Sequence, residues 1–166
     1  PEAILDEKMP EAKKHEQRKF TSVRNEKLIF QASFDDRISY YKTFIREAFA
    51  RKESIALIVP TINDATLFHE HLSKGIEENV VLLTSNLTSK KTQTTWRKVL
   101  DESHVKLIIS TPLFLSLPRT DVSILIIERE SSSAYTSRTR PHVDQRLYAE
   151  VLATKLDICL LYTSDA

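Results

Sequence analysis

Ile55-Ala-Leu-Ile-Val-Pro60 is an uninterrupted apolar run that ends in a proline. Continuous runs of this length, rich in β-branched residues, are typical of strands that are buried on both faces. Similar runs occur at residues 28–30, 80–83, 105–109 and 122–127. The sequence therefore predicts a sheet whose strands are mostly interior.

Stretches with helical spacing separate these runs. Tyr41, Ile45 and Ala48 recur at intervals of three and four residues and place an apolar stripe on one face of a helix. Patterns of this kind predict helices at residues 35–52, 63–74, 88–102 and 143–156. Because strands that alternate with such helices form right-handed βαβ units, we predict a three-layer α/β fold with a mostly parallel sheet flanked by helices.

The composition is that of an ordinary globular domain. Apolar residues make up 41% of the 166 residues, charged residues 28%, and the net charge is +1. No apolar run approaches the roughly 20 residues that a membrane helix needs, and residues 1–19 are too charged for a signal peptide. We therefore expect a cytoplasmic protein without a membrane partner.

Two boundaries divide the chain. Residues 1–26 are charged and predict a linker from an upstream region, whereas residues 27–157 carry the α/β pattern. The last residues, Cys159-Leu-Leu-Tyr-Thr-Ser-Asp-Ala166, resemble a translated sequencing adapter, so we interpret 158–166 as a non-native tail. Without Cys159 the chain has no cysteine, which excludes disulfides and cysteine-based metal sites. His69 and His71 point to different helix faces, so we expect no metal site.

Four segments follow one another in an order typical of a known family. They are Ile55–Pro60, Leu83-Thr-Ser-Asn-Leu87 with Trp96, Ile108-Ile-Ser-Thr111 with Leu115 and Pro118, and Ile124-Leu-Ile-Ile-Glu128-Arg-Glu-Ser-Ser-Ser133-Ala-Tyr135. Together they resemble the first RecA-like lobe of the primosomal protein N′ helicases, which restart DNA replication in bacteria. The resemblance covers about residues 27–153 and implies a RecA-like fold. In that family the cofactors are ATP and Mg²⁺, with zinc in a region outside this chain.

The nucleotide-binding loop of this family departs from its pattern here. Its motif, G-x-T-G-S-G-K-T, falls on Gln31-Ala-Ser-Phe34-Asp35-Asp36-Arg37-Ile38. All of its glycines are replaced, and Gly75 is the only glycine in the chain, so no backbone cradle for phosphate can form elsewhere. Phe34 would fill the phosphate space, Asp35 and Asp36 would repel phosphate, and Ile38 replaces the Mg²⁺-holding threonine.

The acidic motif has changed as well. The family's D-E-E-H falls on Glu128-Arg129-Glu130-Ser131, so the cation of Arg129 replaces the acid that positions the attacking water. Glu128 could still ligate a metal ion, but Mg²⁺ also needs substrate phosphates. We therefore expect that ATP hydrolysis is lost and that this fragment holds no cofactor.

Several residues lie where the family contacts DNA. Pro60, Thr61 and Thr111 match positions that meet the phosphate backbone, although ordinary loop roles are an alternative. Tyr135, with Arg138 and Arg140 in the loop at 131–142, could stack on a base and pair with phosphates. The alternative is a solvated polar loop in which Tyr135 caps the core. The predicted helix at 88–102 also carries a basic surface of Lys90, Lys91, Arg97 and Lys98, which is either a solvated face or a nucleic-acid contact.

Three functions remain open from the sequence. The leading hypothesis is a degenerate helicase lobe that binds single-stranded or forked DNA, or replication and primosome proteins, without hydrolysing ATP. The first alternative is an active ATP-dependent 3′–5′ DNA helicase in the full-length protein. The second is a non-catalytic scaffold for protein interactions.

Overall fold

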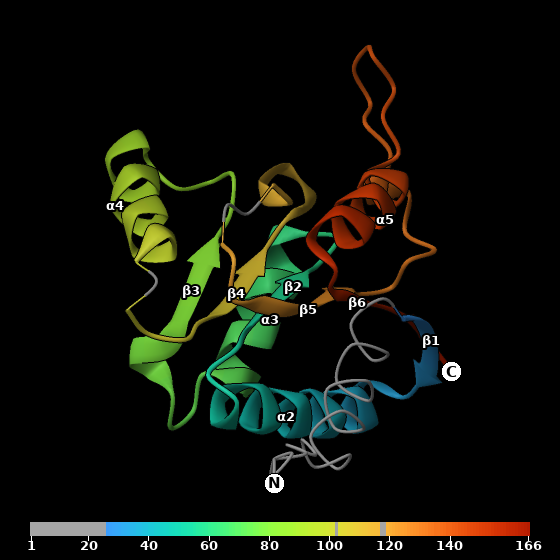
Figure 1. Cartoon of the computed structure of the whole chain (residues 1–166). Coiled ribbons are helices and arrows are strands. Elements are labelled where there is room, and N and C mark those ends of the chain that lie inside the picture. Colours follow the sequence, from blue (N-terminus) through green and yellow to red (C-terminus); the bar gives the residue numbers. More distant parts are fainter. Residues whose placement is uncertain (1–25, 102, 117–118) are drawn as a thin grey trace, which may run out of the picture.

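A computed structural model describes residues 26–101, 103–116 and 119–166. Its centre is a six-stranded sheet in which every neighbouring pair of strands is parallel, in the order β1-β6-β5-β2-β4-β3 (Figure 1). The strands are β1 Lys27–Ala32, β2 Ser54–Ile58, β3 Val80–Leu83, β4 Leu107–Ser110, β5 Val122–Ile127 and β6 Cys159–Asp165. The five strands expected from the apolar runs are therefore present.

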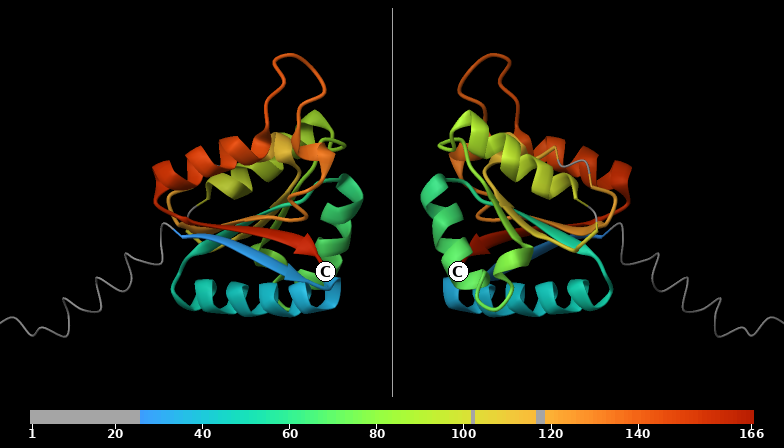
Figure 2. Two further views of the ribbon diagram at one scale, coloured as in Figure 1. Left: turned by 90° about the vertical axis from the view of Figure 1, so that its right-hand side faces the viewer. Right: turned by 90° about the vertical axis from the view of Figure 1, so that its left-hand side faces the viewer.

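Helices cover both faces of this sheet. They are α2 Phe34–Ala50, α3 Ile62–Leu72, α4 Ser89–Leu100 and α5 Gln145–Leu156, joined by short 3₁₀ turns at Glu77–Asn79, Pro112–Phe114 and Ser133–Tyr135. In Figure 2, α2 lies below the sheet, whereas α4 and α5 lie above it. The buried residues of α3 share one core with those of α2. This is the predicted three-layer α/β arrangement of RecA-like type, and each predicted helix is confirmed with small shifts at its ends.

Strand β2 shows why the sheet forms where it does. All five of its residues are buried, and successive side chains enter opposite faces. Ile55 and Leu57 belong to the core between the sheet and helices α2 and α3. Ala56 and Ile58 belong to the core between the sheet and helices α4 and α5. A strand that is apolar on both faces can only be stable in the interior of the sheet, which places β2 between β5 and β4.

Polar side chains start the helices in place of glycine-rich turns. Ser33, Thr61, Thr88 and Asp144 are the N-caps, and each side chain accepts a hydrogen bond from a backbone N–H in the first turn. Such a cap stabilises a helix by about 1 kcal/mol. The Ser33 cap starts α2 at Phe34, two residues after β1 ends at Ala32.

The carboxyl-terminal segment differs from our expectation that the lobe ends at Asp157. Residues 159–165 form β6, which lies between β1 and β5 and pairs along its length with β1. Leu160, Leu161 and Tyr162 are buried there. Although these residues resemble a translated adapter, their apolar side chains form an interior strand. The linker predicted at 1–26 lies outside the described residues except for Glu26. Within the described part of the chain, no helix is long and apolar enough to cross a membrane.

Deletion of residues 158–166 is expected to abolish cooperative thermal unfolding, because β6 is the only strand among the described residues that pairs with β1. Circular dichroism melting of the shortened chain measures this. Removal of Ala166 alone, which lies beyond β6, serves as the control and should leave the melting temperature unchanged. A shortened chain that melts like the full chain would show that β6 contributes nothing to the fold.

Candidate functional site

The carboxyl ends of the strands form the edge where open parallel sheets bind their ligands. Strand β1 leads through Ser33 into α2, and the first turns of α2 carry Arg37 inward. Strand β5 ends at Ile127, and Glu128 follows it directly on the same edge. The topology thus brings together two residues that are 91 positions apart in the sequence.

Arg37 and Glu128 form an ion pair in the interior. The Arg37 Nη2 lies 2.9 Å from Glu128 Oε1, and Arg37 Nε donates to the same oxygen at 3.0 Å. Their side chains are 2% and 1% exposed. A charge buried to this extent is stable only when it is paired and hydrogen-bonded. These two groups therefore neutralise each other.

Two hydroxyl groups complete the surroundings of the Glu128 carboxylate. Tyr41 donates a hydrogen bond to Glu128 Oε2, and Thr163 Oγ1 donates to the same oxygen at 2.6 Å. Burial and the neighbouring carboxylate raise the pKa of Tyr41 far above its usual value, so this hydroxyl remains a donor. Both oxygens of Glu128 are consequently occupied by groups of the chain itself.

The guanidinium of Arg37 is similarly surrounded. It donates to the carbonyl oxygens of Ala32 and Ser164 and to Asp165 Oδ1, the last at 2.6 Å. Burial lowers the pKa of Arg37, but the carboxylates of Glu128 and Asp165 outweigh burial and raise it. We call Arg37, Tyr41, Glu128, Thr163 and Asp165 the buried ion-pair cluster.

The segment that was expected to form the nucleotide loop is structured as strand and helix. Gln31 belongs to β1, and Phe34 begins α2. The centroid of the Phe34 ring lies 5.4 Å from that of the Phe68 ring. Asp35 and Asp36 are exposed in the first turn of α2, and Ile38 is in the core. The Asp36 N–H already donates to Ser33 Oγ. Few backbone donors therefore remain for a phosphate group.

The rest of the acidic motif also contacts the chain itself. Arg129 has a left-handed backbone, with φ of 48°, and its Nη2 lies 2.6 Å from Asp64 Oδ2 on α3. The Glu130 N–H donates to the Thr163 carbonyl oxygen, and the Glu130 carbonyl oxygen accepts a hydrogen bond from Arg146. Ser131 is exposed. The cation of Arg129 thus ties the end of β5 to α3.

Tyr135 does not present a ring for stacking in this structure. The residue is 0% exposed, and its hydroxyl donates to the carbonyl oxygens of Ile58 and Glu128 at 3.1 and 2.6 Å. Burial raises the pKa of this hydroxyl well above its usual value. The geometry corresponds to the alternative that we considered for this residue, a cap on the core.

The remaining DNA-binding candidates fall into two groups. Pro60 is buried, Thr61 caps α3 through Asp64, and the buried Thr111 hydroxyl has no hydrogen-bond partner among the described residues. Arg138 and Arg140, by contrast, are exposed on a hairpin at 136–144 that projects beyond the sheet at the top of Figure 1. Neither arginine forms an ion pair with a residue that the structure describes. They are the exposed members of the predicted set that carry a charge.

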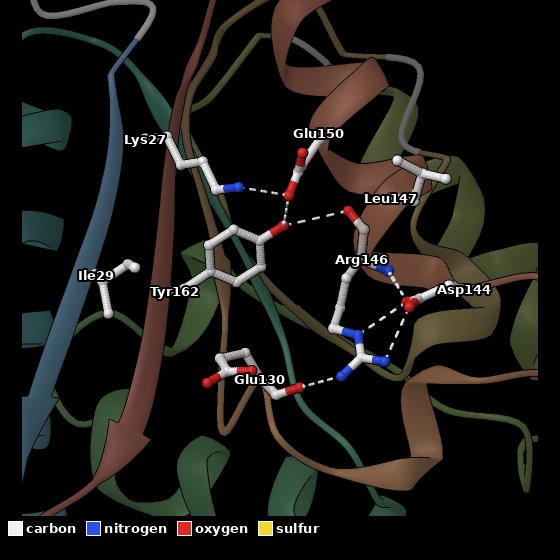
Figure 3. Close-up of a pocket in the computed structure, with 8 residues that line it drawn as sticks. All are labelled: Lys27, Ile29, Glu130, Asp144, Arg146, Leu147, Glu150 and Tyr162. Carbon is white, nitrogen blue, oxygen red and sulfur yellow. Dashed lines mark hydrogen bonds and ion pairs between the residues drawn. The ribbon is translucent and has the colours of Figure 1, made fainter.

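A separate pocket of about 560 Å³ lies between β1 and α5 (Figure 3). Lys27 Nζ lies 2.6 Å from Glu150 Oε1, and Arg146 Nε lies 2.8 Å from Asp144 Oδ1. The hydrogen bond from Lys27 lowers the pKa of Glu150. Most charges of this pocket are therefore paired within it. No group of three or more potential metal ligands occurs among the described residues.

Sequence reasoning missed three members of the buried ion-pair cluster. Tyr41 was recognised only as part of an apolar stripe, although its hydroxyl requires a buried partner. Thr163 and Asp165 lie in the segment that was interpreted as a tail. Only the position of β6 beside β5 reveals their role.

Glu128→Ala is expected to lower the free energy of unfolding by about 3–5 kcal/mol, because it leaves the buried Arg37 without its main counter-charge. Urea titration measures this loss. Arg37→Met combined with Glu128→Leu should cost less than Glu128→Ala, since no buried charge then remains unpaired.

The matched control for this experiment is Glu130→Ala. Its carboxylate forms no ion pair with a described residue, so we expect a change within about 0.5 kcal/mol. Equal losses for Glu128→Ala and Glu130→Ala would contradict the buried ion pair.

No model of a known protein family matches this chain, and no curated protein matches its sequence. The assignment to the primosomal protein N′ helicases therefore remains a prediction that depends on the order of the motifs.

Proposed function

We propose that this chain is a helicase lobe of the primosomal protein N′ type that binds single-stranded DNA and no longer hydrolyses ATP. The Arg37–Glu128 ion pair is the observation that carries this proposal. A working site needs one free cation for the β- and γ-phosphates and one free carboxylate for Mg²⁺. Here Nη2 of Arg37 and Oε1 of Glu128 are 2.9 Å apart, and the two charges neutralise each other.

Nucleotide binding would require this pair to separate. Leaving either charge buried and unpaired costs about 3–5 kcal/mol. A phosphate group would also meet Phe34, whose ring packs against Phe68, and the carboxylates of Asp35 and Asp36. The ion pair between Arg129 and Asp64 is a second obstacle, because it places a cation where the reaction needs an acid. These features argue against the alternative of an active ATPase.

DNA binding is supported by the hairpin at 136–144. Its two arginines are exposed, it contains His142 but no acidic side chain between Ser137 and Val143, and it projects from the lobe. Guanidinium groups pair well with phosphates and carry no sequence preference in such contacts. We therefore assign Arg138 and Arg140 to the DNA backbone and assign no stacking role to Tyr135.

One observation favours the scaffold alternative. Ile29 on β1 is 76% exposed and Leu147 on α5 is 63% exposed, and both line the pocket of Figure 3. An exposed apolar side chain on each side of this pocket suits contact with another protein. A replication or primosome protein is therefore the second candidate partner.

Calorimetric titration of the folded chain with Mg·ATP is expected to give no binding heat at millimolar nucleotide. The physical reason is that the buried ion pair occupies the groups that phosphate and metal would need. Circular dichroism establishes that the titrated protein is folded. Micromolar affinity would overturn the proposal and restore the ATP-driven helicase as the leading function.

Fluorescence anisotropy with a labelled oligothymidine at about 50 mM salt tests DNA binding, since backbone contacts are strongest at low salt. Arg138→Ala with Arg140→Ala is expected to weaken binding about tenfold or more. The salt slope should fall by about 1.4, the contribution of two phosphate contacts to a single strand.

The matched control removes two exposed cations, Lys42→Ala and Arg46→Ala, from α2 on the opposite face of the sheet. It should leave the affinity for the oligonucleotide nearly unchanged. If the unaltered chain binds no single-stranded DNA, the scaffold becomes the better description.

A further inference from the structure

Helix α4 departs from the charge balance of the rest of the chain. The chain has 24 lysines and arginines against 23 acidic residues, whereas the 12 residues of α4 carry four cations and no carboxylate. The four cations are Lys90, Lys91, Arg97 and Lys98. The absence of acids extends back through the preceding loop to Thr84. This concentration of charge on one element requires an explanation.

Helical geometry gathers these cations on one side. At about 100° per residue, Lys90, Lys91, Arg97 and Lys98 fall within an arc of roughly 120°. All four are exposed, whereas Val99 on the other side of the helix is buried in the core. We call this surface the basic face of α4.

The basic face forms no ion pair within the described part of the chain. None of its four cations forms an ion pair with a described residue, unlike Arg37, Arg129 and Arg146 elsewhere. The nearest acid along the chain with a described position is Asp101, whose carboxylate accepts hydrogen bonds from the N–H and hydroxyl of Ser103. A solvated helix face usually intersperses both signs, as α2 does with Asp35 and Asp36. A polyanion would relieve the mutual repulsion on α4.

We infer that the basic face of α4 binds the phosphate backbone of double-stranded DNA. This inference rests on the proposed function, in which the hairpin at 136–144 holds the single strand. The helix is a rigid element about 18 Å long, and its two pairs of cations are separated by about 10 Å along its axis. Such a fixed array suits a duplex, whose phosphates are held in fixed positions with one charge for about every 1.7 Å of axis.

The two DNA contacts can be made by one molecule. Helices α4 and α5 cover the same face of the sheet, and the hairpin projects beside the start of α5 (Figures 1 and 2). A fork that places its single strand on the hairpin and its duplex on α4 would therefore lie across one side of the lobe. Duplex binding by α4 and single-strand binding by the hairpin are therefore compatible in one complex.

The test compares the anisotropy of three labelled DNAs: a single strand, a duplex and a fork. The α4 variant combines three substitutions that retain helix propensity, Lys90→Gln, Lys91→Gln and Lys98→Gln. It should bind duplex and fork about tenfold or more weakly, with a salt slope for duplex lower by about 2.7 for three phosphate contacts. Its affinity for the single strand should change less than about twofold.

The matched control removes three exposed cations from the opposite layer, by Lys42→Gln, Arg46→Gln and Lys74→Gln. It has the same net charge as the α4 variant and should bind duplex and fork like the unaltered chain. Equal weakening by the control and the α4 variant would mean that only the overall charge matters, and would overturn the inference.

The remaining outcomes separate the inference from the proposed function. A chain that binds the single strand, but whose duplex affinity is unaffected in the α4 variant, would overturn the role of α4 alone. A chain that binds none of the three DNAs would overturn both. Loss of duplex binding in the α4 variant, together with loss of single-strand binding in the Arg138/Arg140 variant, would support both.

Discussion

The ion pair between Arg37 and Glu128 is the interaction on which the functional edge of this fold depends. It joins α2 to β5, and its neighbours Tyr41, Thr163 and Asp165 connect both to β6. Removing two charges from water is costly, and only their mutual attraction with complete hydrogen bonding offsets that cost. The pair is therefore a constraint as much as a bond. Release of Arg37 would leave Glu128 buried without a counter-charge, and release of Glu128 would leave Arg37 with only the exposed carboxylate of Asp165.

Because of this constraint, the buried ion pair offers no free charge to a ligand at the carboxyl edge of the sheet. At the carboxyl ends of the strands, Arg129 is paired with Asp64 and Thr61 caps α3, whereas the buried Thr111 hydroxyl has no hydrogen-bond partner among the described residues. The arginines of the hairpin at 136–144 and the four cations of α4 form no ion pair with a described residue. Contacts with a polyanion are thus most readily made outside the region where a RecA-like lobe would bind nucleotide.

The local parts of this structure could be predicted from the sequence, because they depend on periodicity. The apolar run at 55–59 specifies an interior strand, and the stripe that includes Tyr41 and Ile45 specifies the buried side of α2. The partners of the buried cluster could not be predicted, since Arg37 and Glu128 are 91 positions apart and meet only through the strand order. Strand β6 was missed because its octapeptide was interpreted by origin and not by pattern. For Tyr135, the sequence left two roles open, and burial distinguishes them.

The absence of glycine between β1 and α2 and the Arg37–Glu128 ion pair favour the same local arrangement. With Ser33 as its cap, α2 begins directly after β1, so no loop remains in which successive backbone N–H groups could face a phosphate. The same early start carries Arg37 into the interior, where only a carboxylate such as Glu128 can stabilise it. A lysine at position 37 would face the same two carboxylates, and Phe34 would still pack against Phe68. A single substitution at this position therefore could not create a nucleotide site, because the loop and the buried pair would have to change together.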